Sequence, residues 1–244
     1  SHMANKIKKK SAKTAKNVAI IMDGNGRWVM SNSLNISKGH SKGVEVVREI
    51  VEESVNQKLS SLTLYAFSSE NWSRPKPEID AIKKLVVKAI NEQVPDLIKQ
   101  KVKLKFFGNI DDFGSKILLK IKNAENATNH QESVLSLNIA LGYGGRQDIV
   151  NVTKYISEQI ISKNINIDDI DEDLISKFSC CPVDEIDLLI RTGGDKRISN
   201  FLLYQIAYTE INFIDKYWPD FKKEDFIECL DNFKKVSRRF GKRI

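Results

Sequence analysis

The sequence predicts a single α/β domain with a central, mainly parallel six-stranded sheet flanked by helices. Two observations carry this prediction. Short apolar, β-rich runs recur along the chain, and between them lie stretches whose apolar residues stand three or four positions apart, which is the spacing of one helix face. With 244 residues, of which 41% are hydrophobic and 29% charged, the chain is also long enough to bury one sizeable core.

The apolar runs predict buried parallel strands, because strands that are covered on both faces lack a polar alternation. They occupy residues 18–22, 62–67, 102–107, 134–141, 186–190 and, as a short strand at an edge, 211–214. The helical stretches occupy residues 43–57, 78–100, 111–126, 147–162 and 224–236. Because no repeat, low-complexity tract or linker follows residue 16, residues 17–244 are expected to form the one domain.

Most of the formal charge of +7 lies in the first 16 residues, which hold six lysines and no acidic residue. The chain opens with Ser-His-Met, a start typical of a cleaved tag, so residues 1–16 are interpreted as a tag remnant and a disordered basic arm. Without those lysines the positive and negative charges nearly cancel. We therefore expect no nucleic-acid partner, and the arm leaves open only a weak contact with an anionic surface.

The three cysteines, Cys180, Cys181 and Cys229, show neither CxxC spacing nor a paired framework, which favours buried thiols in a reducing, cytoplasmic compartment. The longest apolar stretches are far shorter than the ~20 residues that cross a bilayer, so at most a transient contact with the inner membrane face is expected. The sequence lacks both GxxxxGK[ST] and GxGxxG, which excludes a P-loop and a dinucleotide-binding loop.

Parallel sheets place ligand sites at the carboxyl ends of their strands, so the segment after the first strand is the first candidate for chemistry. Its glycines, Gly24 and Gly26, allow backbone N–H groups to turn inward around an anion. Asp23 can hold a divalent cation, and Arg27 can bind phosphate oxygens through two parallel hydrogen bonds. A plain turn would not need this Asp and Arg, so the segment predicts a diphosphate site.

The segment after the second strand, residues 68–75, carries hydroxyls, a carboxylate, an amide and a guanidinium. Such residues also cap helices, so a purely structural role stays open. Because the preceding strand directs this segment to the same edge as Asp23, we interpret it as part of one site. A third segment, residues 191–200, carries a glycine pair and three basic residues, and its Ser199 or Asn200 is expected to cap a helix over residues 201–207. Two basic segments predict two phosphorylated substrates.

Three other features allow both a functional and a structural interpretation. His40 follows Gly39 at a helix start, where it can donate to an anion or serve only the fold. Glu210 is the best candidate to complete a cation site with Asp23, although its spacing suits a surface acid equally well. The helix over residues 78–100 has a wide apolar face, which either packs in the core or lines a cavity for an apolar ligand. Five of the residues 168–173 are acidic and superficially resemble an aspartate-rich diphosphate motif. They stand at the start of an expected helix, where acidic side chains are favourable, so we interpret them as capping residues.

Several long motifs in order make the chain resemble a cis-prenyltransferase and, more narrowly, the bacterial undecaprenyl diphosphate synthases. They are Met-Asp-Gly-Asn-Gly-Arg-Trp at residues 22–28, Phe-Ser-Ser-Glu-Asn-Trp at residues 67–72, Arg-Thr-Gly-Gly at residues 191–194 and Arg-Ile-Ser-Asn-Phe-Leu-Leu at residues 197–203. The resemblance implies a homodimer that uses Mg²⁺ to condense isopentenyl diphosphate onto an allylic diphosphate such as farnesyl diphosphate. The implied product, with a new cis double bond at each step, is undecaprenyl diphosphate, the lipid carrier for cell-wall synthesis.

The resemblance also implies residue roles. Asp23 would hold Mg²⁺ and help the diphosphate leave, Asn71 would take part in removing the proton that sets the double bond, and Glu210 would meet the metal. The implied substrate-binding set is Gly24, Asn25, Gly26, Arg27, Trp28, His40, Ser68, Ser69, Glu70, Trp72, Arg74, Arg191, Arg197, Ile198, Ser199, Arg239 and Gly241. In that set the first loop and His40 serve the allylic diphosphate, the later arginines serve isopentenyl diphosphate, and the C-terminal pair reaches the partner subunit's site.

The chain departs from the family pattern at Ile36, where an arginine is usual. One guanidinium is therefore missing from the allylic site, and we expect Lys38 or Lys42 to replace it in part as a point charge. The alternative class is a non-catalytic, prenyltransferase-like subunit. A binding scaffold, however, has no physical need for the set of Asp23, Asn71, Arg191, Arg197 and Glu210 together.

Overall fold

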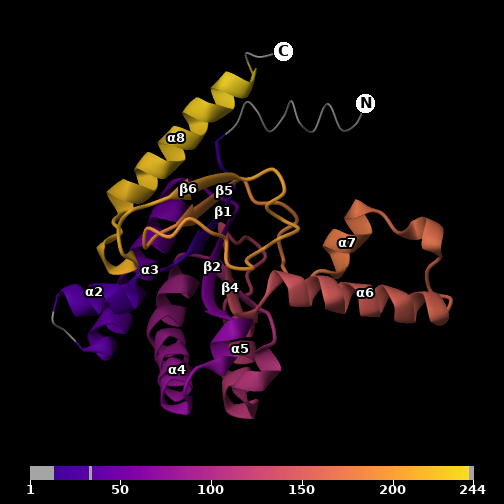
Figure 1. Ribbon diagram of the computed structural model, residues 1–244, viewed down its shortest axis with the longest axis horizontal. Helices are drawn as coiled ribbons and strands as arrows, with labels where there is room; N and C mark the ends of the chain where they lie inside the picture. Colours follow the sequence, from indigo (N-terminus) through magenta and orange to yellow (C-terminus); the bar gives the residue numbers. More distant parts are fainter. Residues whose placement is uncertain (1–13, 33–34, 242–244) are drawn as a thin grey trace.

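The computed structural model describes residues 14–32 and 35–241, with the side chains of residues 36–37 and 237–241 left out. Six strands form one sheet in the order β3-β4-β2-β1-β5-β6, and every neighbouring pair is parallel. The strands are β1 (Asn17–Ile21), β2 (Ser61–Ser68), β3 (Val102–Phe107), β4 (Leu135–Tyr143), β5 (Leu188–Arg191) and β6 (Glu210–Phe213). This confirms the predicted fold class, and β6 lies at an edge as expected (Figure 1).

Helices connect the strands, and their bounds extend several of the predicted ones. They are α2 (Asn25–Ser31), α3 (Ile36–Asn56), α4 (Lys76–Lys99), α5 (Ser115–Ala127), α6 (Gly145–Ile161), α7 (Glu172–Phe178) and α8 (Lys223–Gly241). The stretch predicted as one helix over residues 111–126 is divided, because Gly114 adopts φ +94° between a 3-10 turn and α5. The acidic run does cap a helix, since the Asp171 side chain accepts from the Leu174 N–H at the start of α7.

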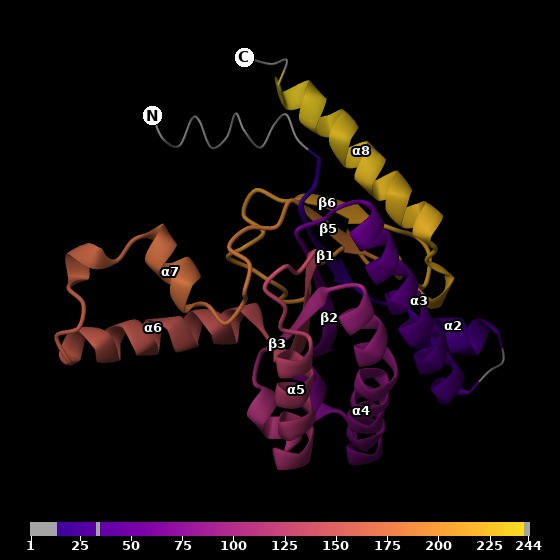
Figure 2. The ribbon, with the colours of Figure 1, turned by 180° about the vertical axis from the view of Figure 1, so that it is seen from behind.

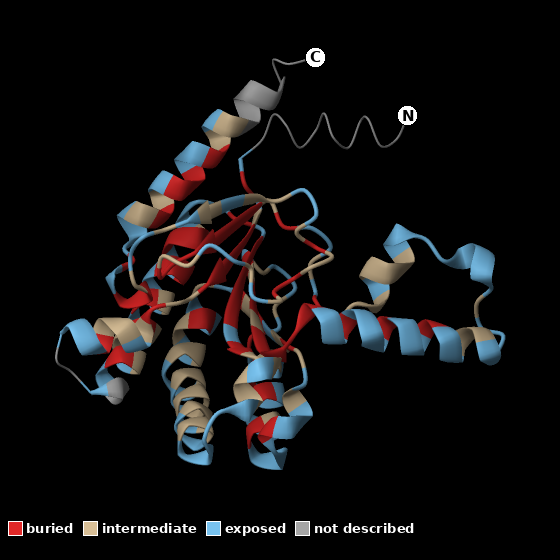
Figure 3. Ribbon diagram, viewed as in Figure 1, coloured by how far each residue is buried: buried red, intermediate tan, exposed pale blue. Residues whose placement is uncertain are grey.

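The core occupies both faces of the sheet, and Figure 3 shows its strands as the most completely buried part of the fold. On one face, α3, α4 and α8 cover the strands, with Ile50, Leu97 and Phe226 among the contacts. On the other face, two segments without helix supply Cys181 and Phe201. The side chains that follow the carboxyl ends of the strands are left at the rim between these layers.

Two helices extend away from the rest of the fold. Figures 1 and 2 show α6 and α7 projecting from the body as an arm in both views. The arm carries exposed apolar side chains, of which Ile161 is 81% exposed. Such surface is normally covered in the working protein.

Residues 14–16, which were expected to belong to the basic arm, are among the described residues. Ala15 is buried in the main core, and the Lys16 carbonyl accepts hydrogen bonds from the Ser60 and Ser61 N–H groups. The rest of the expected basic arm, residues 1–13, lies outside the described residues.

The cysteines only partly match the expectation of buried thiols. Cys181 and Cys229 are buried, but Cys180 is exposed, and all three are free. Burial raises the pKa of the Cys181 thiol to about 12 and that of Cys229 to about 11. Within the described part of the chain, no helix is both long and apolar enough to cross a membrane.

Candidate functional site

Three of the predicted segments meet at the carboxyl edge of the sheet because of strand register. Ile21 pairs with Tyr65 on one side and with Arg191 on the other. Asp23 follows Ile21 by two residues, and Ser68 follows Tyr65 by three. The sheet therefore brings together segments that are distant in sequence, such as those of Asp23 and Arg191, which are 168 residues apart.

The backbone of Asp23 is held by two distant segments. Its N–H donates to Thr192 Oγ1 at 3.0 Å, and the Thr192 hydroxyl donates back to the Asp23 carbonyl at 2.8 Å. The same carbonyl accepts from the Trp218 N–H. Thr192 and Trp218 are buried, so the position of Asp23 is fixed by the core rather than by its own loop.

The Asp23 carboxylate contacts two guanidinium groups. Its Oδ2 atom lies 3.0 Å from Arg191 Nη2 and 3.1 Å from Arg27 Nη2. The Arg191 side chain is only 7% exposed, whereas that of Arg27 is 42% exposed and lies over the Tyr217 ring. Because a buried guanidinium needs a counter-charge, Asp23 serves as the counter-charge of Arg191.

Arg191 also organises the loop that follows β5. Its Nη1 atom donates to the Arg197 carbonyl at 2.6 Å and to Ser199 Oγ at 2.7 Å. Its Nε atom is buried without a hydrogen-bond partner among the described residues. A buried donor of this kind is expected to bind an additional acceptor, such as a phosphate oxygen.

A second carboxylate continues the row of charges outward. Asp195 lies 3.0 Å from Arg197 and 4.0 Å from Arg27. The hydrogen bond from Arg197 holds the pKa of Asp195 below its usual value, with the charges of Arg27 and Arg191 adding to the effect. Five side chains of alternating sign thus form a charged row, in the order Arg191, Asp23, Arg27, Asp195 and Arg197.

The glycine after Thr192 is required by this row. Gly193 adopts φ +95°, and a Cβ atom there would lie 2.8 Å from Arg27 Nη2 and 3.0 Å from Asp23 Cβ. A larger residue would be strained at this φ and would crowd both charged side chains. The sequence signalled this glycine pair only as a phosphate-binding turn.

The first loop is the start of α2, whose first N–H groups have no side-chain cap, so the expected anion-binding role of Gly24, Asn25 and Gly26 stays a prediction. Gly24 is the N-cap of α2 with φ +114°, and its carbonyl accepts from the Trp28 N–H. The Trp28 indole donates to Asp220 at 2.9 Å, so it faces the β6–α8 segment. Asn25 Oδ1 is buried without a partner among the described side chains.

His40 lies one turn inside α3 and is half-buried. Burial lowers its pKa below the usual value, against the nearby Glu78 carboxylate, which raises it. The side chain of Ile36 is not among the described ones. The expectation that a nearby lysine partly replaces the charge of the missing arginine therefore stays a prediction. Of the two candidates, Lys42 already pairs with Glu45 at 3.5 Å, and Lys38 is exposed.

The segment after β2 forms a short 3-10 helix, Ser69–Ser73. Asn71 Oδ1 accepts from the Ser68 N–H at 3.0 Å, so part of its amide serves a cap, as the structural alternative foresaw. Glu70 accepts from Asn200 Nδ2 at 2.9 Å. Burial tends to raise the pKa of Glu70, but hydrogen bonds, that of Asn200 foremost, outweigh it and hold the pKa below its usual value.

Trp72 and Arg74 make their contacts outside the charged row. The Trp72 ring contacts Phe67 and Phe113 in the core, and its Nε1 atom is buried with no acceptor among the described residues. Arg74 pairs with Glu78 at 2.6 Å. Neither contacts the charged row directly in any recorded ion pair or hydrogen bond of the described chain.

The helix expected over residues 201–207 is absent, and these residues form turns. Ser199, Asn200 and Leu202 have φ values of +49°, +63° and +47°, which are incompatible with a right-handed helix start. The predicted helix N-terminus for a phosphate therefore does not exist. Ile198 packs partly buried against the core on this face, and Ser199 is held by Arg191 instead.

Glu210 does not reach Asp23 within one chain. Glu210 is the first residue of β6 and pairs with Leu188 of β5. Leu188 lies three residues before Arg191, so Glu210 is offset from the level of Arg191 by ~10 Å along the strands, at ~3.3 Å per residue. The expectation that both carboxylates hold one metal ion is thus corrected for a single chain. Arg239 and Gly241 fall where side chains are not described, so their expected role is not examined by the structure.

The donor set at the edge still fits Mg²⁺. The described residues contain no group of three or more His, Cys, Asp or Glu side chains suited to hold a metal. Mg²⁺, however, is commonly bound by one or two carboxylates together with waters and substrate phosphates. Asp23 is a hard oxygen donor that stands beside groups suited to phosphate, so it fits this mode.

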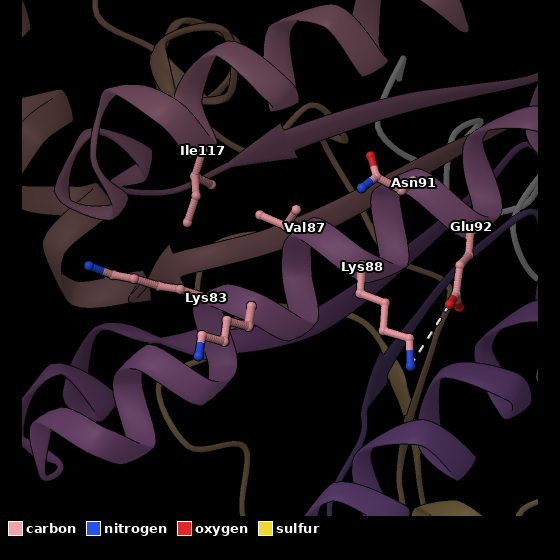
Figure 4. A pocket seen from close by; sticks show the side chains of 7 residues that line it. Lys83, Val87, Lys88, Asn91, Glu92 and Ile117 are labelled. Atoms are coloured by element: carbon pink, nitrogen blue, oxygen red, sulfur yellow. Dashed lines mark ion pairs between the residues drawn. The ribbon is translucent and has the colours of Figure 1, made fainter.

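Two hollows border these elements. A polar one of about 540 Å³ adjoins the charged row and is lined by Arg27, Gly193, Gly194, Asp195, Asp215, Lys216, Tyr217 and Asp220. The other, of about 500 Å³, lies between α4 and α5 and is shown in Figure 4; it is lined by Lys83, Lys84, Val87, Lys88, Asn91, Glu92 and Ile117. None of the predicted site residues lines the second hollow.

An apolar region begins next to the charged row, over β2. Ala66 is exposed although its strand is central in the sheet, because β2 is irregular there and Ala66 has no partner on β4. On α4, Leu85 and Ala89 are only half-buried. These residues leave apolar surface uncovered where the sequence allowed a cavity wall.

Comparison with known proteins agrees with the geometry. Residues 21–241 match the family model described as "Putative undecaprenyl diphosphate synthase". An isoprenyl transferase of Prochlorococcus marinus is 41% identical over 98% of this chain and 88% of its own length. The farnesyl-diphosphate-specific ditrans,polycis-undecaprenyl-diphosphate synthase of Escherichia coli K12 is 43% identical over 93% of this chain and 89% of its own.

Solved structures give the same result. Lavandulyl diphosphate synthase from Lavandula x intermedia, determined with dimethylallyl diphosphate, has a TM-score of 0.87 at 29% identity and covers 91% of this chain and 95% of its own. A probable undecaprenyl diphosphate synthase from Campylobacter jejuni has a TM-score of 0.75 at 31% identity and covers 91% and 96%. The chain therefore belongs to the prenyltransferase family of the undecaprenyl diphosphate synthases.

Proposed function

We propose that this chain condenses isopentenyl diphosphate repeatedly onto an allylic diphosphate, farnesyl diphosphate, to give undecaprenyl diphosphate for cell-wall synthesis. The observation that carries the proposal is the row of three guanidinium and two carboxylate groups at the carboxyl edge. Three guanidiniums exceed what one diphosphate requires, which suits two phosphorylated substrates side by side. The names of the curated relatives support the same substrates.

In this proposal the charged row changes partners when substrates bind. Phosphate oxygens take the positions that Asp23 and Asp195 occupy beside Arg27, Arg191 and Arg197. Asp23 would then hold Mg²⁺, which when bound neutralises charge that develops on the leaving diphosphate. The arginines stabilise the same charge and fix the distance between the two reactants.

Asn71 acts on the proton side of the reaction. An amide is a poor base, and its Oδ1 atom already accepts from the Ser68 N–H. We therefore assign Asn71 to orienting a water molecule or a diphosphate oxygen that accepts the proton. The growing hydrocarbon lies against the uncovered apolar surface of Ala66, Leu85 and Ala89.

The exposed apolar side chains outside the site support a homodimer. Ile149, Val150 and Tyr155 are exposed on α6, and Ile211 and Phe213 on the edge strand β6. A second copy of the chain would cover them and the open edge of β6. Sedimentation of Tyr155→Glu tests this: a shift from dimer to monomer is expected, and an unchanged dimer contradicts this interface.

The free cysteines suit action in the cytoplasm, and the absence of a spanning helix among the described residues is compatible with brief contact at the membrane surface during product release.

The decisive experiment is incorporation of labelled isopentenyl diphosphate with farnesyl diphosphate, with and without Mg²⁺, followed by chain-length separation. We expect Mg²⁺-dependent C55 product and a loss of at least about hundredfold in Asp23→Ala, a typical cost for removing one stabilising group. Asp80→Ala, which removes an exposed carboxylate of α4, is the matched control and should keep full activity. Absence of incorporation by the unaltered chain would contradict the proposal.

A further inference from the structure

Asn200 lies in a segment with an unusual backbone conformation. It adopts φ +63° between Ser199 and Leu202, whose φ values are also positive. Asparagine adopts this left-handed conformation more readily than other non-glycine residues, but three non-glycine residues with positive φ within four positions are rare. Such backbone persists only where surrounding contacts require it.

The backbone carbonyl of Asn200 and both polar atoms of its side-chain amide each have a hydrogen-bond partner. Its carbonyl accepts from the Gly145 N–H at 2.7 Å, and its Oδ1 accepts from the Arg146 N–H at 2.9 Å. Its Nδ2 donates to Glu70 Oε1 at 2.9 Å. The amide orientation is unambiguous, because a backbone N–H can only donate and a carboxylate can only accept.

These contacts join two parts of the site. On one side, the loop of Asn200 is fixed to Arg191 through Ser199 Oγ and the Arg197 carbonyl. On the other side, Asn200 holds Glu70, the residue directly before Asn71. The contact is tight, since a Cβ atom on Gly144 would lie 2.5 Å from Ser69 Oγ and 2.8 Å from Asn200 Nδ2.

We propose that Asn200 is a positioning residue that sets the distance between the cationic loop of Arg191–Ser199 and the turn that carries Asn71. This inference rests on the proposed function, in which the first segment binds isopentenyl diphosphate and the second handles its proton. Asn200 itself touches neither reacting group; it acts through Glu70 and through the start of α6.

Asn200→Asp isolates the donor. Aspartate has the same size, tolerates positive φ and still accepts from the Arg146 N–H, so the contact to α6 is kept. It loses the donor to Glu70 and places two carboxylates in contact. We expect kcat to fall by about tenfold to hundredfold, as for small displacements of reacting groups, while KM for isopentenyl diphosphate changes less than about threefold.

The double variant Asn200→Asp with Glu70→Gln reverses the polarity of the hydrogen bond, because the glutamine amide can donate to the new carboxylate. We expect kcat to return to within about threefold of Glu70→Gln alone. In Asn200→Asp, activity relative to the unaltered chain should also rise as pH falls, because a proton shared by the two carboxylates relieves their repulsion. A merely structural cap of α6 predicts neither effect.

Asn109→Asp is the matched control, since that amide also donates to a carboxylate, Asp112, in an exposed turn away from the charged row. Its kcat should change less than about twofold. Hydrogen–deuterium exchange gives a readout that does not need activity: amides of residues 69–73 should exchange faster in Asn200→Asp and recover in the double variant.

The outcomes separate the two proposals. If kcat of Asn200→Asp stays within about twofold, or if the double variant recovers neither kcat nor exchange protection, Asn200 does not position the Asn71 turn. If the unaltered chain makes no polyprenol but the exchange pattern follows the prediction, the positioning role stands and the proposed function fails.

Discussion

The Asp23 carboxylate occupies guanidinium groups that a diphosphate needs, so removing its charge should strengthen diphosphate binding when no metal is present. The contacts are 3.0 Å to Arg191 and 3.1 Å to Arg27. The Arg27 pair is partly exposed and counts for about 0–1 kcal/mol. The Arg191 contact is more buried, and a hydrogen bond to a charged group contributes about 1.5–3 kcal/mol, of which the incoming diphosphate recovers only a part.

A net gain of about 1.4 kcal/mol in Asp23→Asn corresponds to a tenfold lower Kd for inorganic diphosphate. At a diphosphate concentration ten times the Kd of the unaltered chain, ligand stabilisation is about 1.4 kcal/mol for that chain and about 2.7 kcal/mol for the variant. For a chain of this size the difference amounts to roughly 3–5 °C in Tm. The assay is thermal unfolding in EDTA, with and without diphosphate.

Asp215→Asn is the control, because Asp215 borders the same polar hollow but has no recorded ion pair with the described arginines. It should lower the Kd by less than about threefold. If diphosphate shifts the Tm of Asp23→Asn no more than that of the unaltered chain, Asp23 does not compete with diphosphate, and the exchange of partners in the charged row is refuted. With Mg²⁺ and both substrates, the same variant should be nearly inactive.

Three further outcomes follow from particular side chains. Ala66→Leu adds volume on exposed apolar surface without crowding the core, so stability should change by less than about 0.5 kcal/mol while products become shorter; an unaltered chain-length distribution contradicts the position of the hydrocarbon. His40 has a lowered pKa in the folded chain, so its contribution to the free energy of unfolding is present above pH ~6.5 and is lost as pH falls through the lowered pKa. Urea unfolding at pH 7 and pH 5 should show a smaller loss in His40→Gln, and equal losses would exclude His40 as the cause. Because burial raises the pKa of Cys181 to about 12 and that of Cys229 to about 11, both thiols should react with iodoacetamide at pH 7.5 only after unfolding, and rapid labelling of the native chain would contradict their burial.

The sheet and most helices were predictable because their signals are local. Apolar periodicity marks β3 at its observed bounds and places α4 within two residues at its start. The start of α3 was missed by seven residues, since residues 37–42 contain no apolar side chain that would mark a helix face. The expected helix after Asn200 failed for another reason: long-range contacts to Gly145 and Glu70 hold the backbone in a conformation that local propensity disfavours.

The sequence indicated which segments meet at the carboxyl edge of the sheet, but not how their charged side chains pair. Segment position after each strand indicated Asp23, Arg27 and Arg191, yet nothing in the sequence indicated that Asp23 neutralises both arginines. Thr192 and Tyr217 were not identified, because a hydroxyl that holds a backbone and a ring beneath a guanidinium leave no motif. Glu210 was placed beside Asp23 although the predicted parallel strand over residues 211–214 begins directly after it, which puts it at the amino end of that strand.

The strand order explains why these charges meet at all. Strands β2, β4 and β3 lie in that spatial order on one side of β1, and β5 and β6 lie on the other side. The direction of the connections therefore reverses between β1 and β5. Ligands of open α/β sheets bind at such a switch point, outside the carboxyl ends of the strands. Asp23 follows β1 and Arg191 ends β5, so the topology and the chemistry indicate the same place independently. Three guanidiniums at one place would repel one another, and the two carboxylates between them neutralise that repulsion at positions where, in the proposed function, phosphate oxygens replace them.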